Sequence, residues 1–117
     1  MISLLRRRLY KASLHSISGF RAAWRSEEAF RIEVLLGLAL FVAAFFVGET
    51  RLEIALLLMS VFIVLIAELL NTGLEKIIDR ISLEHHENSR FVKDVGSAAV
   101  GLALVQVIVV WLLIIVH

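Results

Sequence analysis

The sequence predicts an all-α membrane protein, with an N-terminal amphipathic surface helix followed by three transmembrane helices. Three observations predict this fold. Hydrophobic residues make up 60% of the 117-residue chain, against about 45–50% in soluble domains, and so small a chain cannot bury that much apolar surface alone. The apolar residues are concentrated in three runs, and the chain has no proline. The runs also lack the alternation of a membrane-spanning β-strand.

Composition excludes several classes of protein. The absence of cysteine excludes disulfides and thiolate metal sites. The high hydrophobicity excludes a disordered chain. A formal net charge of +1 provides no general attraction for nucleic acids. We therefore expect one membrane-embedded domain that covers residues 1–117.

Residues 1–28 are expected to form the surface helix. Apolar residues such as Leu4, Leu5 and Leu9 alternate there with arginines and a lysine. Basic amphipathic helices of this kind rest in the membrane interface. The helix is either an anchor on anionic lipid or, in addition, the wall of a site at the same depth.

Three membrane spans follow the surface helix. A helix needs about 20 apolar residues to cross a bilayer core of about 30 Å. We expect spans at about residues 29–48, 54–78 and 95–116, with the second extending into the cytoplasm. Residues 79–94 are expected to form a cytoplasmic loop between the second and third spans.

The distribution of lysine and arginine predicts the orientation. Seven of the twelve lie in residues 1–33, four lie around the second connection, and only Arg51 lies in the first. The positive-inside rule therefore predicts that the N-terminus and the loop of residues 79–94 are cytoplasmic.

The second span carries polar residues that are unusual at membrane depth. Its end reads AELLNTGLEKIIDR, and a helical rotation of about 100° per residue places Glu68, Asn71, Glu75 and Asp79 on one face. Ionisable groups in a membrane are costly and usually face a protein interior or a functional cavity. A hydrogen-bonded seam between subunits is the structural alternative, although three acids in a seam repel one another unless they are neutralised.

The residue types on this stripe favour phosphoryl transfer. Glu75 and one of Glu27 or Glu28 can converge on a divalent cation, because Mg²⁺ prefers carboxylate oxygens and substrate phosphates. Lys93 can meet a phosphate as a mobile point charge. Glu68 lies about two turns deeper, where a carboxylate suits a general base for a buried hydroxyl. The arrangement predicts phosphoryl transfer from a soluble donor to a lipid alcohol.

Familiar nucleotide-binding motifs are absent from the sequence. There is no GxxxxGK[ST] loop, no GxGxxG and no HRD or DFG set. A kinase with this sequence would have no standard nucleotide-binding fold.

Three segments carry a family resemblance. AELLNTGLEKIIDR, EHHENSRFVKDVGSAAV and FRAAWRSEEAFRIE resemble the signature of the small bacterial integral-membrane diacylglycerol kinases, E-x-x-N-[ST]-x-x-E-x-x-x-D followed by K-D. The resemblance extends from about Arg8 to the end of the chain. It implies a homotrimer in the bacterial inner membrane that converts MgATP and diacylglycerol into phosphatidate and ADP, for phospholipid recycling.

The resemblance also implies roles for individual residues. Glu68 would be the general base, Glu27 and Glu75 the metal ligands, and Asn71 a supporting residue. The ATP-binding residues would be Arg8, Ala12, His15, Glu27, Glu75, Glu84, His85, His86, Lys93 and Asp94. The lipid-substrate residues would be Arg21, Ala22, Ala23, Trp24, Ala29, Phe30, Arg31, Ile32, Glu33, Glu68 and Ser97.

Three residues depart from the family pattern. His15 and His85 stand where a tyrosine is usual, which leaves the details of nucleotide contact open. Glu28 stands where a small residue is usual, so that either Glu27 or Glu28 could be the metal ligand, with Glu27 favoured by alignment.

Two other functions remain as alternatives. A sister branch with the same polar core phosphorylates undecaprenol, although GSAAV and R-A-A-W look nearer to the diacylglycerol branch. A non-enzymatic transporter subunit or scaffold would need neither ATP nor Lys93, and it would leave the grouping of acids and lysine unexplained.

Small residues at the start of the third span favour close helix packing. Ser97 and Gly101 form a small-xxx-small pair within GSAAVGLA. Either packing within one chain or association between chains would use them. The family resemblance implies the second, with sites shared between neighbouring subunits.

Overall fold

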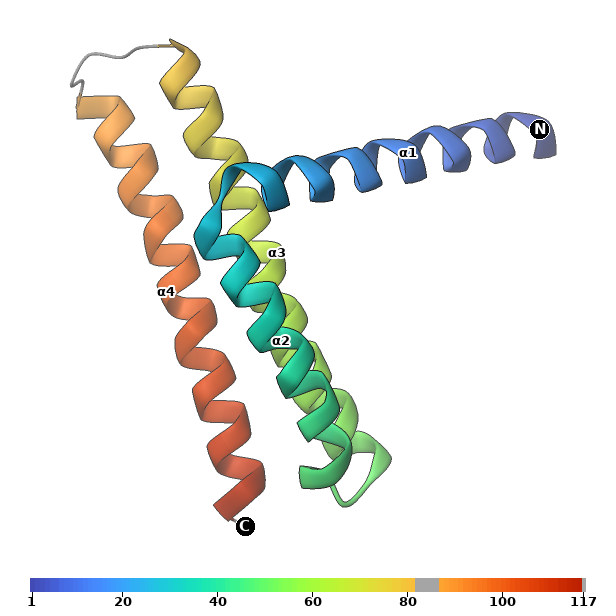
Figure 1. Cartoon of the computed structure of the whole chain (residues 1–117), viewed down its shortest axis with the longest axis vertical. Helices are drawn as coiled ribbons and strands as arrows, with labels where there is room; N and C mark the ends of the chain where they lie inside the picture. The colour runs from blue at the N-terminus through green and yellow to red at the C-terminus, as the bar shows by residue number, and fades with distance from the viewer. Residues whose placement is uncertain (82–86, 117) are drawn as a thin grey trace.

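The computed structural model describes residues 1–81 and 87–116, and these form helices joined by short connections (Figure 1). The helices are α1 (Ile2–Ser26), α2 (Glu28–Val47), α3 (Arg51–Ile81) and α4 (Glu87–Val116). The described part of the chain contains no β-strand. The prediction of an all-α protein is therefore confirmed.

A single residue separates the surface helix from the bundle. Glu27 has extended backbone angles (φ −123°, ψ 111°), which end α1 and start α2. Its N–H still donates to the Ala23 carbonyl at 3.0 Å, and its own carbonyl accepts from the Arg31 N–H at 3.2 Å. The rings of Phe20 and Phe30 meet edge to face across the corner, with centroids 5.5 Å apart. These contacts make the corner a defined turn, from which α1 leaves the bundle at a steep angle (Figure 1).

A tight connection joins α2 to α3. The Thr50 hydroxyl accepts from the Glu53 N–H at 3.1 Å, while the Glu53 carboxylate accepts from the Glu49 N–H at 3.0 Å. This reciprocal pattern resembles a capping box. A Cβ on Gly48 would lie 2.6 Å from Ile54 Cγ1, so the turn requires glycine there.

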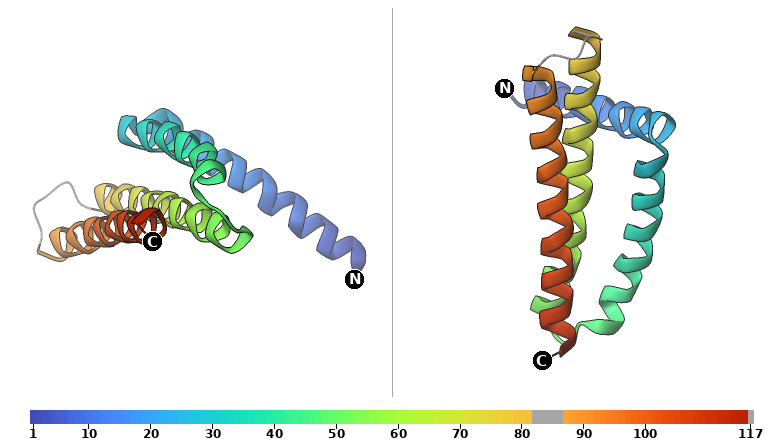
Figure 2. Two further views of the ribbon diagram at one scale, coloured as in Figure 1. Left: turned by 90° about the horizontal axis from the view of Figure 1, so that it is seen from below. Right: turned by 90° about the vertical axis from the view of Figure 1, so that its left-hand side faces the viewer.

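The central helix of the bundle is α3. It packs most extensively on α4 and then on α2, and it lies between them when the bundle is seen end-on (Figure 2). Few side chains are buried between these helices, among them Ala44, Leu57, Val61 and Ala103. Phe41 and Phe62 add an edge-to-face contact between α2 and α3 at 5.1 Å.

Most of the large apolar side chains are exposed on the outside of the bundle. By length and composition, α2, α3 and residues 88–116 of α4 can each cross a membrane, which confirms the prediction of three spans. The bilayer core and neighbouring protein are the surroundings that can cover this surface.

The helices α3 and α4 are longer than a bilayer core requires. The 31 residues of α3 correspond to about 46 Å of helix, against about 30 Å of hydrocarbon. The helices continue past the level of α1 (Figures 1 and 2). α3 runs to Ile81 and α4 begins at Glu87, so residues 79–81 and 87–94 of the expected loop are helical instead. Neither segment contains a glycine or proline that would interrupt a helix.

One polar cluster lies inside the membrane-spanning part. Gln106 Nε2 of α4 donates to the Ser60 carbonyl of α3 at 2.7 Å and to the Ala103 carbonyl at 3.0 Å. Trp111 Nε1 donates to Ser60 Oγ at 3.1 Å, and Ser60 is only 2% exposed. The hydrocarbon core contains no water that could hydrogen-bond these side chains, so each bond satisfies a polar group that lipid would leave unpaired. The cluster therefore ties α3 to α4 near the middle of the bundle.

Candidate active site

The acidic stripe predicted on the second span exists as a face of α3. Glu68, Asn71 and Glu75 are each partly buried, whereas Asp79 is exposed nearer the end of the helix. The stripe begins in the apolar part of α3 and continues to the end where α3 and α4 pass the level of α1 (Figure 2). It therefore connects membrane depth with the surface at that end.

Asn71 and Glu75 interact directly. Asn71 Nδ2 donates to Glu75 Oε1 at 3.3 Å, across one turn of α3. Asn71 Oδ1 is buried and has no hydrogen-bond partner among the described residues. A buried acceptor without a donor is costly, so the surroundings of this oxygen need an explanation.

Lys93 of α4 is joined to the same stripe. Its Nζ donates to Asp79 Oδ1 at 2.8 Å, with the two side chains 45% and 55% exposed. The carboxylate of Glu75 also attracts the ammonium group. The structure thus brings Lys93 to the Glu75 end of the stripe. The neighbouring Asp94 is exposed and forms a longer contact, 3.9 Å, with Arg90.

Asp79 was not among the predicted site residues. The sequence did contain the relevant signal, because Asp79 shares the helical face of Glu68, Asn71 and Glu75. Its pairing with Lys93 depends on how α4 packs on α3, which periodicity along one helix does not encode.

Glu68 has a second carboxyl group as its neighbour. Glu33 of α2 lies close enough to Glu68 for the two carboxyl groups to interact. Its Oε2 is buried, and among the described residues no amide, hydroxyl or ammonium donor reaches it. Two carboxylates in contact repel each other unless a proton or a cation lies between them. The two carboxyl groups therefore form an acidic pair at the level where the stripe begins.

Glu33 also faces a small cavity inside the bundle. The cavity has a volume of about 110 Å³ and lies between α2, α3 and α4. Apart from Glu33, its lining is made of glycine and apolar residues: Leu36, Gly37, Leu40, Val61, Val64, Leu65, Leu104 and Val107.

A larger groove separates α1 from α3. Its volume is about 560 Å³, and among the described residues Lys76 is the only charged one that lines it. Two of the residues expected to contact the lipid substrate, Ala22 and Ala23, form part of its wall. The remaining lining residues are Ser16, Gly19, Phe20, Ser26, Leu69, Thr72 and Gly73.

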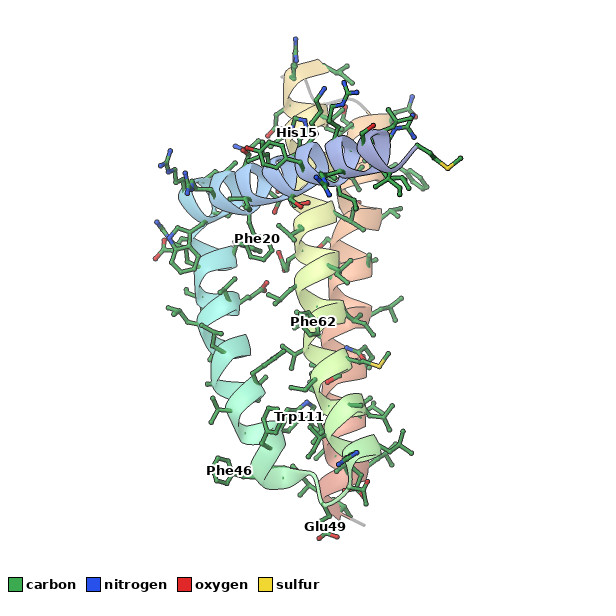
Figure 3. The ribbon with its side chains drawn as sticks, turned by 90° about the vertical axis from the view of Figure 1, so that its right-hand side faces the viewer. His15, Phe20, Phe46, Glu49, Phe62 and Trp111 are labelled. Carbon is green, nitrogen blue, oxygen red and sulfur yellow. The ribbon has the colours of Figure 1, made fainter. Side chains whose placement is uncertain are left out.

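The expected nucleotide residues on α1 lie apart from this groove. Arg8, Ala12 and His15 are exposed (His15 is labelled in Figure 3), and the first half of α1 projects away from the bundle (Figure 1). Glu84, His85 and His86 lie outside the described residues.

The other residues expected to contact lipid occupy varied surroundings. Phe30 is fully buried against Phe20, so its ring packs within the protein. Trp24 and Ile32 are 39% and 51% exposed. Arg31 is partly buried, and the remaining members of the set are exposed: Arg21, Ala29 and Ser97.

A divalent cation fits the donor chemistry of this site. Glu75 supplies a carboxylate, and Asn71 Nδ2 donates to that carboxylate and so orients it. Mg²⁺ typically takes one or two carboxylates together with substrate phosphates. Glu27 is partly buried at the α1–α2 corner, whereas Glu28 is exposed. No three His, Asp or Glu side chains converge on one point within residues 1–81 and 87–116.

Comparison with known proteins identifies the family. Residues 14–115 match the model of the prokaryotic diacylglycerol kinases. The chain belongs to the prokaryotic diacylglycerol kinase family. Membership in this family confirms the resemblance expected from the stripe and the Lys-Asp pair, and it makes the chain a kinase. Arg8 and Ala12 precede the matched residues.

Alignments with curated members of the prokaryotic diacylglycerol kinase family extend over most of this chain. A diacylglycerol kinase of Haemophilus influenzae is 44% identical over 88% of this chain and 87% of its own length. A diacylglycerol kinase of Pseudomonas aeruginosa is 44% identical over 90% of this chain and 85% of its own length. A diacylglycerol kinase of Escherichia coli K12 is 41% identical over 89% of this chain and 85% of its own length.

Proposed function

We propose that this kinase transfers the γ-phosphate of MgATP to the hydroxyl of diacylglycerol, giving phosphatidate and ADP. One observation carries the proposal. The face of α3 presents Glu68 beside Glu33 at membrane depth, and Glu75 with Asn71 and Lys93 toward the surface. A proton acceptor and a phosphate-binding group therefore lie along one helix. This suits an acceptor that enters from lipid and a donor that enters from water.

Each side chain has a defined task in this reaction. Glu68 accepts the proton of the diacylglycerol hydroxyl as the hydroxyl oxygen bonds to the γ-phosphorus. The bond between that phosphorus and the oxygen of ADP breaks, and ADP leaves. Lys93 compensates the phosphate charge that builds up in the transition state. Asp94 is proposed to contact the nucleotide.

Glu75 is proposed as a ligand of Mg²⁺, with Glu27 as a second ligand. The hydrogen bond from Asn71 Nδ2 to the Glu75 carboxylate supports this assignment. When bound, Mg²⁺ supplies positive charge that neutralises the phosphates. Asn71 orients the Glu75 carboxylate through its Nδ2.

The expected lipid and nucleotide contacts extend this proposal. Residues 21–24 and 29–33, together with Ser97, would contact the lipid, with Glu33 acting through its contact with Glu68. Arg8, Ala12, His15 and residues 84–86 would complete the ATP site. Such a kinase would return diacylglycerol to phospholipid synthesis.

The proposed setting is the bacterial inner membrane. Seven Lys and Arg residues in residues 1–33, against one in the first connection, support a cytoplasmic N-terminus. ATP then reaches the exposed ends of α3 and α4 from the cytoplasm. We further propose that the chain works as a homotrimer.

A phosphorylation assay tests the function. Purified protein in detergent micelles is given labelled ATP with dioleoylglycerol or undecaprenol, with and without Mg²⁺. We expect Mg²⁺-dependent label in phosphatidate and its loss in Glu68→Gln, which removes the proton acceptor but keeps the side-chain shape. A preference for undecaprenol would contradict the proposal that diacylglycerol is the substrate. Full activity of Glu68→Gln would contradict the proposal that Glu68 is the general base.

A further inference from the structure

Helix α4 approaches α3 closely at Gly96. This glycine is buried, and a Cβ built on it would collide with Asn71 Oδ1. The same Cβ would lie 3.2 Å from Asn71 Cγ and 3.7 Å from Leu74 Cδ1. The space that a side chain would fill is therefore occupied by the Asn71 amide.

The other helical glycines have different surroundings. A Cβ on Gly73 or Gly101 would meet nothing within 4 Å, and one on Gly37 would meet the apolar Val61 Cγ1 at 3.3 Å. Gly37 thus permits ordinary close packing of helices. Gly96 instead makes room for a polar side chain that belongs to the candidate active site.

The position of Asn71 Oδ1 determines which acceptor the amide nitrogen, Nδ2, can reach. With Oδ1 directed at Gly96, Nδ2 points along α3 and donates to Glu75 Oε1 at 3.3 Å. The hydrogen that replaces a Cβ on Gly96 faces Oδ1, as in a weak C–H···O contact. A methyl group there would force the amide to rotate, and Nδ2 would leave Glu75.

We propose that Gly96 is a positioning residue of the phosphoryl-transfer site. Its lack of a side chain holds the Asn71 amide in the orientation that hydrogen-bonds the Glu75 carboxylate, and so prepares Glu75 to bind the cation of MgATP. The proposal rests on the proposed function for its activity readout. Partners that orient a metal ligand typically account for about 10–100-fold in metal affinity or activity.

The test compares Gly96→Ala with Gly101→Ala in the full-length protein in micelles. The two variants introduce the same methyl group on the same helix, but only the first meets Asn71. One readout is the Mg²⁺ concentration that gives half-maximal phosphorylation. The other is binding of Mn²⁺ without substrates, followed by electron paramagnetic resonance. We expect Gly96→Ala to weaken both by about tenfold or more, and far more than Gly101→Ala, whose methyl group reports the effect of helix packing away from Asn71.

A double-mutant comparison separates positioning from loss of folding. In an Asn71→Ala background the amide is gone, so Gly96→Ala should add no further loss of Mn²⁺ affinity. A further loss of similar size in that background would overturn the proposal, as would an unchanged metal dependence in Gly96→Ala alone. Absence of Mn²⁺ binding by the parent would also overturn it. If the parent binds Mn²⁺ but phosphorylates no lipid, the proposed function fails, while the Mn²⁺ comparison still decides the role of Gly96.

Discussion

Lys93 and Asp79 show how a site residue depends on a partner from another helix. Lysine is a flexible chain with about 2 kcal/mol of rotamer entropy, so an unrestrained ammonium group spends little time at any one point. The 2.8 Å contact with Asp79 holds this group next to the stripe, on the side of Glu75. Half-exposed ion pairs contribute about 0–1 kcal/mol, which limits the effect on catalysis.

Replacement of Asp79 by asparagine tests this positioning. Because at most about 1 kcal/mol is lost, we expect kcat/KM for MgATP to fall about two- to fivefold, with little change in thermal stability. Steady-state kinetics at saturating lipid measure the effect, and Asp79→Glu should restore part of the loss. An unchanged or higher kcat/KM in Asp79→Asn would show that Asp79 does not position Lys93.

At the level of the helices, α3 and α4 are joined at three heights. The Lys93–Asp79 pair lies near their exposed ends, Gly96 and Asn71 lie below it, and the cluster of Ser60, Gln106 and Trp111 lies deeper in the bundle. The two upper contacts involve the candidate site. The deepest contact involves no site residue, so its role is to hold the register of the two helices.

Gln106→Leu should therefore affect stability and leave catalysis intact. Interhelical hydrogen bonds in membranes average about 0.6 kcal/mol and reach about 1.7 kcal/mol. We expect the free energy of unfolding in micelles to fall by an amount in this range, with an unchanged Mg²⁺ dependence. Val105→Leu, which changes an exposed apolar neighbour, is the control. A shift in Mg²⁺ dependence in Gln106→Leu would link the deep cluster to the site.

The molecule as a whole is more extended than a compact chain of its length. Its radius of gyration is 17.4 Å, against about 13 Å for a compact chain of this length. The first half of α1 accounts for much of the extension, because it projects from the bundle with its apolar side chains exposed (Figures 1 and 2). We propose that in a homotrimer this segment contacts a neighbouring bundle and that Arg8 belongs to the neighbour's nucleotide site.

Mixing of inactive subunits tests the shared site. If Arg8 contributes to the nucleotide site of a neighbouring subunit, a mixture of Arg8→Ala and Glu75→Gln subunits should form some complete sites. The mixture should then recover activity that neither variant shows alone. Light scattering should also give a protein mass of three chains of 13.1 kDa each. Mixed oligomers, verified with differently tagged copies, that remain inactive would contradict a site shared in this way.

The sequence alone determined the surface helix, the three membrane spans and the polar stripe, but not the helical structure of residues 79–81 and 87–94. Hydrophobic runs of this length require helices in a membrane, and a helical period places Glu68, Asn71, Glu75 and Asp79 on one face. The Lys-Asp pair and the stripe also carried the family resemblance, which the match over residues 14–115 confirmed. These features are local, since each depends only on neighbours along one helix.

Contacts between helices were decided only by the tertiary structure. The pairing of Lys93 with Asp79, the neighbouring carboxyls of Glu33 and Glu68, and the space that Gly96 leaves for Asn71 all depend on how α2 and α4 pack on α3. The burial of Phe30 depends on the corner at Glu27, where α1 turns away. Periodicity predicts which residues share a face of a helix, but side-chain packing in three dimensions selects which helix meets that face.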